Sequence, residues 1–393
     1  MNFRMIGRIM GLIALILAGF MATAIPVSLL MDSGDALPLF QGTSVLLVFG
    51  LSLYVVFRNA DRNIGKREGI LIVTGAWVLM SFFGALPYWL SGAIPGFADA
   101  CFESASGLTT TGATVLNDIE ATSAGILYWR SLTQWIGGMG IIVLTVALFP
   151  LLGIGGVELF SAEAPGPKSD RIHPRITETA KRLWYIYLGA TGVCAVVLLI
   201  CGMTLYEAIN HALTTMATGG FSTKNAGAGH FSPLIQYVLV VFMFLAGTNY
   251  AVIYLGLKNR WQAVWRSDEF RLYLGLCGGL IVLSTAWILF ATENVDLEQS
   301  FRDSAFTVIS LVTTTGFATA DYTQWTPGLT LVFFLLLFSG ACAGSTSGGI
   351  KLIRHLSFFK MVQMEMKRVL QRKAIVVVKL NKEIVDPKML THI

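Results

Sequence analysis

The sequence predicts an all-α polytopic membrane protein built from repeated helix–re-entrant loop–helix units. First, 54% of its 393 residues are hydrophobic and 13% are charged, whereas soluble domains carry about 25% charged residues. Second, apolar runs long enough to cross a bilayer recur along the whole chain. Third, a short Thr/Gly segment occurs three times, and the last glycines of the copies are 108 and 96 residues apart. That spacing is too long for a solenoid repeat and suits a membrane unit of two spans.

Residues 1–68 are expected to form a leading transmembrane hairpin. The apolar run 6–30 follows Arg4 and Arg8, and it continues toward another span without a clear small-residue cleavage site. We therefore interpret it as a retained helix rather than a signal peptide. A second span is expected at 40–57, and the basic loop 58–67 ends the hairpin.

Three pore repeats are expected to follow, at 69–182, 183–270 and 271–393. Each contains two apolar spans, and between them lies a helix too short to cross the bilayer. The expected spans are 70–91 and 126–152, 183–203 and 233–257, and 272–291 and 329–353, with short helices at 98–110, 206–217 and 298–314. A basic loop is expected at 161–182. With the hairpin, this makes eight spans and three re-entrant loops.

Each short helix ends at a Thr/Gly segment, which we expect to be part of a cation selectivity filter. Glycine allows a positive φ, so that successive carbonyls can point the same way, and rings of carbonyls replace the hydration shell of K⁺ in potassium channels. The negative end of a helix also favours a cation just beyond it. Close helix packing is the alternative use of small residues, but three copies in equivalent positions argue against packing alone. The expected filter residues are Thr110, Thr111, Gly112, Thr218, Gly219, Gly220, Thr314, Thr315 and Gly316.

The expected span 329–353 contains a stretch that is too rich in glycine and hydroxyl residues to form a stiff helix. Irregular backbone at membrane depth is tolerated only against protein or a water-filled cavity. We therefore expect this stretch to lie below the filter and to act as a gate, with a small-residue packing face as the alternative. The expected gate residues are Ala343, Gly344, Ser345, Thr346, Ser347, Gly348 and Gly349.

Two basic residues are possible pore charges. Arg130 comes early in its span, after Tyr128 and Trp129, and an intramembrane charge is a functional candidate by default. The alternative is an arginine that snorkels to the interface beside aromatic residues. Lys351 ends the Gly-rich stretch; it could face the cavity or be the first cytoplasmic charge, and the second reading is preferred.

The distribution of charge predicts the orientation of the chain. With both termini in the cytoplasm, all of the 28 Lys and Arg residues except Arg130, Lys224 and Arg302 lie on the cytoplasmic side, as the positive-inside rule requires. The outer loops are mainly acidic and would concentrate cations at the entrance. The five cysteines form no CxxC pair or metal-ligand spacing, so we read them as core residues. Membrane lipid is an expected partner; nucleic acid and an organic cofactor are not.

The combined motifs resemble the Trk/Ktr/HKT potassium-transporter superfamily, and specifically its TrkH branch. The matching residues are the Thr/Gly segments at 109–115, 218–223 and 313–319, together with 137–141, 164–167 and 343–349, and the leading hairpin is a feature of that branch. The resemblance implies potassium uptake through a multi-pass protein of the bacterial cell inner membrane, with K⁺ at the filter carbonyls and residues 343–349 as the intramembrane gate. It also implies a homodimer and a cytosolic nucleotide-binding TrkA-type ring that regulates it.

The family it resembles has four repeats around a pseudo-fourfold pore, whereas three are found here, so a fourth repeat is expected to be absent. A truncated chain is one explanation, and a second chain that supplies the missing quarter is another. A secondary cation transporter with broken helices and a non-conducting fragment or regulatory subunit remain as alternatives. An enzyme is not expected, because the sequence has no HExxH or GxSxG motif and no paired intramembrane carboxylates.

Overall fold

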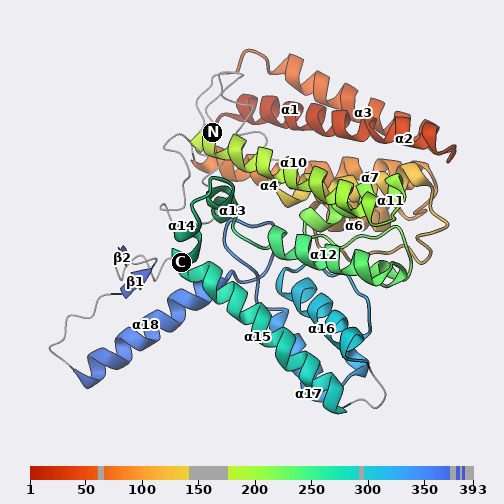
Figure 1. Ribbon diagram of the computed structural model, residues 1–393. Coiled ribbons are helices and arrows are strands. Elements are labelled where there is room, and N and C mark those ends of the chain that lie inside the picture. The colour runs from red at the N-terminus through yellow and green to blue at the C-terminus, as the bar shows by residue number, and fades with distance from the viewer. Residues whose placement is uncertain (61–65, 141–175, 292–295, 372–377, 381–382, 386–393) are drawn as a thin grey trace. The chain divides into compact units, whose positions relative to one another are not determined.

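The computed structural model describes residues 1–60, 66–140, 176–291, 296–371, 378–380 and 383–385. Within these ranges the regular secondary structure is helical apart from a small antiparallel hairpin of β1 (Val378–Leu380) and β2 (Glu383–Val385), which was not predicted from the sequence (Figure 1). The chain forms two compact units. The first holds the described residues up to Val238 together with Thr315–Phe317, and the second holds the other described residues from Leu239 onward.

The first unit begins with the predicted hairpin, formed by α1 (Phe3–Ala22), α2 (Ala24–Leu30) and α3 (Ala36–Val56). The expected helix 6–30 begins earlier, at Phe3, and Thr23 separates it into α1 and α2, which still form one span of 28 residues. Helices α1 and α3 approach closely because Gly11 and Gly50 carry no side chains: a Cβ on Gly11 would lie 2.9 Å from the carbonyl oxygen of Gly50.

The first repeat contains α4 (Lys66–Gly84), α5 (Leu86–Leu90), α6 (Phe97–Leu108) and α7 (Ala124–Gly138). The expected helix 70–91 is interrupted at Ala85, just before Pro87, which cannot donate a backbone hydrogen bond. The short helix expected at 98–110 is α6. Helix α7 begins as predicted, but most of the expected remainder of this span lies outside the described residues.

The second repeat contains α10 (Ile176–Ile200), the short helix α11 (Leu205–Met216), the 3₁₀ turn η2 (Gly227–His230), α12 (Pro233–Ala246) and α13 (Tyr250–Leu257). The expected loop 161–182 ends early, because Lys181 and Arg182 already lie in α10. The expected straight span 233–257 is wrong, since α12 and α13 are bent by 104°. The side chain of Asn249 caps the new helix by accepting the backbone N–H of Ala251 at 2.7 Å.

The second unit continues with α14 (Trp261–Arg266), α15 (Asp268–Ala291), the short helix α16 (Leu297–Val312), η3 (Tyr322–Gln324), α17 (Pro327–Leu336) and α18 (Leu352–Leu370). Helix α15 begins at Asp268, slightly before the expected span 272–291. Helix α17 ends at Leu336, and the backbone between it and α18 is non-helical. The predicted break within 329–353 is thus confirmed, because this span is helical only up to Leu336 and again from Leu352.

Five helical stretches among the described residues are long and apolar enough to cross a membrane, or six if the bent pair α12–α13 is counted as one span. The two remaining expected spans differ: 126–152 leaves the described residues, and 329–353 is a short apolar helix followed by the break. Large apolar side chains face outward on these helices, such as Val282 and Phe290 on α15, which are 68% and 93% exposed. Such surfaces suit contact with lipid.

Candidate functional site

The three short helices α6, α11 and α16 end in the same backbone conformation. We call residues 109–112, 217–220 and 313–316 the Thr/Gly loops. The second residue of each loop is left-handed: Thr110, Thr218 and Thr314 have φ of 54°, 52° and 56°. The fourth is left-handed as well, with φ of 79°, 77° and 80° at Gly112, Gly220 and Gly316. The three glycines therefore have the positive φ that the sequence predicts. The left-handed conformation of the three threonines was not predicted.

Backbone hydrogen bonds explain how each helix stops. The N–H of Thr110 donates to the carbonyl of Gly107 at 2.9 Å, and the N–H of Thr111 donates to that of Ser106 at 2.8 Å. This is a Schellman motif, in which the left-handed position is usually glycine. The second loop repeats both bonds. A β-branched residue in this conformation is a genuine outlier, and an outlier found at three equivalent positions points to a functional constraint.

Neighbouring Thr/Gly loops contact each other through backbone in the first unit. A side chain on Gly112 would overlap the carbonyl oxygen of Gly219, and one on Gly220 would overlap that of Thr315. Gly316 differs, because no described residue lies within 4 Å of the place where its Cβ would be. The first loop thus abuts the second, the second abuts the third, and the third has an open side.

Gln134 of α7 holds the second loop on both sides of Gly220. Its side-chain amide donates to the carbonyl of Gly219 at 2.6 Å and accepts the N–H of Phe221 at 3.0 Å. The side chain is fully buried, so water does not compete for these bonds. Gln134 therefore fixes the orientation of the backbone around Gly220.

Glycines at the end of α7 bring this helix against two loops. A Cβ on Gly137 would overlap the carbonyl oxygen of Leu108, at the end of α6. A Cβ on Gly138 would lie 2.7 Å from the Cα of Ala217, which caps α11. Any side chain at either position would push α7 away from the short helices, so the Gly-Gly pair allows backbone-to-backbone packing at the site.

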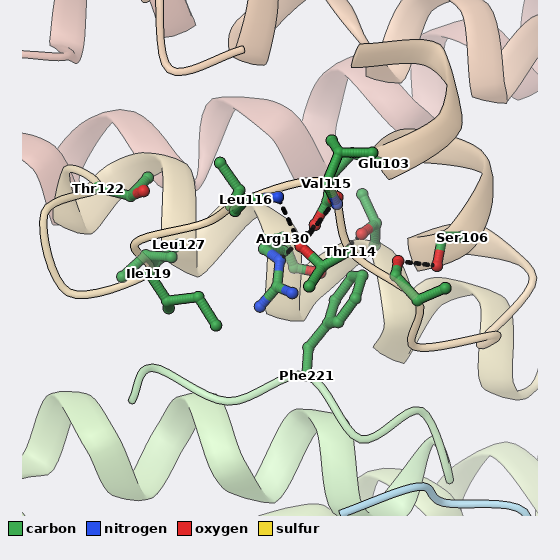
Figure 2. Close-up of polar contacts among 12 residues, drawn as sticks. Glu103, Ser106, Thr114, Val115, Leu116, Ile119, Thr122, Leu127, Arg130 and Phe221 are labelled. Carbon is green, nitrogen blue, oxygen red and sulfur yellow. Dashed lines mark hydrogen bonds and ion pairs between the residues drawn. The ribbon is translucent and has the colours of Figure 1, made fainter. Parts of the chain in front are cut away.

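Arg130 of α7 is 2% exposed and forms an ion pair with the fully buried Glu103 of α6, with 2.6 Å between Nε and Oε1 (Figure 2). Its Nη1 donates to the carbonyl of Ser222 at 3.1 Å, and its guanidinium lies 3.4 Å from the centre of the Phe221 ring. The snorkelling alternative is therefore wrong for this arginine. Its charge is neutralised by Glu103, and its contacts join the first repeat to the second Thr/Gly loop.

Glu103 also organises the chain that follows the first loop. Its carboxylate accepts the hydroxyl of Thr114 at 2.9 Å and the N–H of Val115 at 2.9 Å, as Figure 2 shows. A buried carboxylate needs such partners, because an unpaired charge in the interior is very costly. Glu103 and Arg130 together connect α6 and α7 to the residues that directly follow the first and second Thr/Gly loops.

The loops of the first two repeats contain polar and charged groups that are linked to one another. The side-chain amide of Asn225 donates to Asp118 at 2.9 Å, and its oxygen accepts the N–H of Ile119 at 2.7 Å. The hydrogen bond from Asn225 holds the pKa of the exposed Asp118 carboxyl below its ordinary value. Lys224 pairs with Glu207 at 3.3 Å. The contacts of Asn225 therefore join the loops of the first two repeats, whereas the pair of Lys224 and Glu207 lies within the second repeat.

Residues 343–349, which we call the Gly-rich segment, lie in the second unit against the bend between α12 and α13. The carbonyl of Gly344 accepts the N–H of Tyr250 at 3.1 Å, and the hydroxyl of Thr346 donates to the carbonyl of Ala246 at 3.3 Å. Gly344 and Gly349 are left-handed, with φ of 70° and 67°, so glycine is required for this path.

The Gly-rich segment also contacts two residues that the sequence analysis singles out, the filter candidate Thr314 and the possible pore charge Lys351. The N–H of Gly348 donates to the hydroxyl of Thr314 at 2.6 Å, which places the segment against the third Thr/Gly loop. The ammonium of Lys351 donates to the carbonyl and the hydroxyl of Ser347. Lys351 is thus bound to the Gly-rich segment, as well as being the residue that precedes α18.

Sequence reasoning missed three buried polar residues that support these loops: Glu103, Gln134 and Glu269. Glu269 is 5% exposed and accepts the N–H of Ala343 at 2.7 Å. An available signal was the placement of Glu103 and Gln134 within apolar or small-residue stretches beside the Thr/Gly loops. No such signal marked Glu269, because it lies in the stretch 258–271, whose basic residues are typical of a solvated loop. The described residues contain no group of three His, Cys, Asp or Glu suited to a metal ion.

Comparison with known proteins gave consistent matches. A family model described as "TrkH: Cation transport protein" matches residues 38–393. The chain is 40% identical over 395 residues to the Trk system potassium uptake protein TrkH of Escherichia coli strain K12, covering 99% of this chain and 82% of that one. It is 38% identical to TrkH of Halomonas elongata, covering 97% and 80%. The crystal structure of the potassium transporter TrkH from Vibrio parahaemolyticus matches with a TM-score of 0.86, 34% identity, and coverage of 99% and 81%.

Proposed function

The chain belongs to the TrkH family of cation transport proteins, and we propose that it takes up potassium ions across a bacterial inner membrane through a filter formed by its Thr/Gly loops. The observation that carries this proposal is the repeated conformation of Thr110–Gly112, Thr218–Gly220 and Thr314–Gly316, left-handed at the first and last residue each time. Each loop follows the negative end of a short helix. Relatives of the chain are named as potassium uptake proteins.

The backbone of the loops supports a filter of oxygen atoms. Alternating left-handed residues let carbonyls along one strand point to one side, as a dehydrated K⁺ requires. In a helix end of this kind glycine would be the less strained choice at Thr110, Thr218 and Thr314. Retaining threonine there keeps a hydroxyl beside the carbonyls, and a hydroxyl is a further oxygen ligand for a cation.

The open side of Gly316 is where we place the continuation of the filter. Gly112 and Gly220 each face a carbonyl of the next loop, whereas Gly316 faces none among the described residues. A fourth loop, from another segment or another chain, would supply that carbonyl and close a ring. Without a fourth loop, the polar backbone beside Gly316 would contact lipid or water. Each backbone polar group left unpaired in lipid costs roughly several kcal/mol.

In this proposal the Gly-rich segment is the gate, and its hydrogen bond to Thr314 supports that role. The termini lie in the cytoplasm, because most Lys and Arg residues then fall on the inner side. The transporter is a homodimer, and a cytosolic nucleotide-binding ring of TrkA type acts on the gate. Relatives that carry the name "Trk system" support a multi-component assembly.

Rubidium uptake tests the proposed function. A bacterium that lacks its own potassium uptake systems would express the chain, and growth at low K⁺ and rubidium influx would be measured. We expect influx that K⁺ suppresses and Na⁺ does not. Influx no greater than in cells with an empty vector, although the chain is present in the membrane, would contradict the proposal.

A further inference from the structure

Glu269 is the second residue of α15, and its carboxylate fastens both ends of the Gly-rich segment. One oxygen, Oε1, accepts the backbone N–H of Ala343 at 2.7 Å and that of Ile353 at 3.1 Å. Ala343 begins the segment, and Ile353 lies just after it, in the first turn of α18. A single buried side chain from a different helix therefore determines where the segment starts and where it ends.

The chemistry of these bonds makes Glu269 a strong tether between the segment and a different helix. The N–H of Ile353 is one of the donors that have no partner within α18, and it lies at the positive end of that helix. Lys351, which precedes α18, forms no side-chain cap, so the carboxylate of Glu269 supplies the cap from α15. Hydrogen bonds to a charged acceptor are roughly twice as strong as neutral ones.

Three other tethers join the Gly-rich segment to distant parts of the chain, and all three are neutral; the charged Lys351, which donates to Ser347, lies only two residues beyond the segment. The three neutral tethers are the bond from Tyr250 to Gly344, the bond from Thr346 to Ala246 and the bond from Gly348 to Thr314. A displacement of the segment that frees its ends must break both bonds to Glu269, so that a buried carboxylate loses two backbone donors. The segment is thereby held in the conformation seen here.

The neighbouring residue links the same corner of α15 to the cytoplasmic helix. Asp268 accepts the ammonium of Lys360 at 2.8 Å, and Lys360 lies in the third turn of α18. Asp268 and Glu269 therefore bind α18 at two residues, Lys360 and Ile353. A shift of α18 would pull on the charged pair and on the tether of the Gly-rich segment together.

We propose that Glu269 is the positioning residue that holds the gate closed, and that a shift of α18 releases it. This inference rests on the proposed function only in naming the Gly-rich segment as the gate. The shift breaks the bonds from Ala343 and Ile353 to Glu269 and the ion pair between Asp268 and Lys360. Any partner that acts on the cytoplasmic end of α18 would thus control the segment.

A cysteine within the structure reports the position of the segment without any ion flux. Cys342 immediately precedes the Gly-rich segment and is 1% exposed. In a full-length chain whose other four cysteines are replaced by serine, the rate at which a water-soluble methanethiosulfonate modifies Cys342 measures how often the segment moves. A second background that retains only Cys277, on α15 and 2% exposed, detects general loosening.

We expect Glu269→Ala to raise the modification rate of Cys342 about tenfold or more, the factor expected for loss of one charge-assisted hydrogen bond. Glu269→Gln keeps a neutral acceptor and should raise it less. Lys360→Gln should also raise it, because the link to α18 is weakened. The matched control Glu298→Gln removes a half-exposed carboxylate from α16 and should leave the rate unchanged.

An unchanged Cys342 rate in Glu269→Ala would overturn the proposal. An equal rise at Cys342 and Cys277 would also overturn it, because it would show loosening of the whole unit rather than release of the segment. The proposed function fails separately: if the parent chain carries no rubidium, the Cys342 rates still decide whether Glu269 holds the segment.

Discussion

The backbone N–H of Gly348 donates a hydrogen bond of 2.6 Å to the hydroxyl of Thr314. Thr314 is the left-handed residue of the third Thr/Gly loop, with φ of 56°, and Gly348 belongs to the Gly-rich segment. The two parts of the chain that the sequence marks as filter and gate are therefore in direct contact. A hydroxyl that accepts this bond has one lone pair fewer for an ion, so moving the segment would change the filter itself.

Thr314→Val tests this contact. Valine keeps the β-branched shape but removes the acceptor for the N–H of Gly348, and because this contact is exposed the loss is that of an ordinary hydrogen bond, about 0.5–1.5 kcal/mol. We expect higher rubidium leak in the absence of the regulatory ring, because the contact no longer favours the closed segment. Thr314→Ser retains the hydroxyl and is the matched control. Equal leak in the two variants would contradict the role assigned to the bond.

The left-handed threonines predict an unusual effect on stability. An L-residue in this conformation is strained by about 1–2 kcal/mol, and glycine is not. Thr218→Gly should therefore be more stable than Thr218→Ala by about 1 kcal/mol, since both lack the hydroxyl and only alanine keeps the strain. Thermal unfolding of the purified variants in detergent measures the difference. Identical melting temperatures would contradict the strain at Thr218.

Breaking the ion pair between Glu103 and Arg130 should be severe. Glu103→Gln or Arg130→Gln leaves one buried charge without its partner, and such losses cost about 3–5 kcal/mol. The double variant Glu103→Leu with Arg130→Met removes both charges and should recover part of that loss. Thermal unfolding of the three variants provides the comparison. A double variant less stable than both single variants would show that the charges are not coupled as their 2.6 Å contact indicates.

Gln134 predicts a change in selectivity. Gln134→Leu removes both hydrogen bonds that hold the backbone around Gly220, and the larger freedom of that loop should weaken the preference for K⁺ over Na⁺. Gln134→Glu retains an acceptor for Phe221 but turns a carboxylate toward the carbonyl of Gly219, and should weaken it too. The degree to which K⁺ and Na⁺ each suppress rubidium influx measures the selectivity of both variants. Wild-type competition in Gln134→Leu would show that the loop does not need this support.

Much of the architecture follows from the sequence because lipid restricts the choices. Apolar length identifies the spans, and the short helices α6, α11 and α16 agree with prediction to within about two residues, which is the usual uncertainty of helix ends. The glycines of the Thr/Gly loops were predicted to be left-handed for a steric reason that holds in any context. The break before Lys351 was predicted from its excess of glycine.

Tertiary contacts account for what the sequence could not predict. The bend at 247–249 depends on Asn249, which caps α13, and no local pattern distinguishes it from a straight span. The left-handed Thr110, Thr218 and Thr314 run against residue preference, so only the surrounding structure imposes them. The partner of Arg130 is 27 residues away in the chain. Pairings across that distance leave no periodic signal, and Glu103, Gln134 and Glu269 were missed for the same reason.

The ratio of K⁺ to Na⁺ competition for rubidium influx in Gly220→Ser tests the central claim most directly. A side chain at Gly220 would overlap the carbonyl of Thr315 and would sit at a φ of 77°, so the second and third loops must separate. Gly189→Ser is the control, because Gly189 lies on α10 and no described residue comes within 4 Å of the place where its Cβ would be. The account predicts that Gly220→Ser loses the preference for K⁺ while Gly189→Ser keeps it. A folded Gly220→Ser chain with the wild-type preference would contradict it.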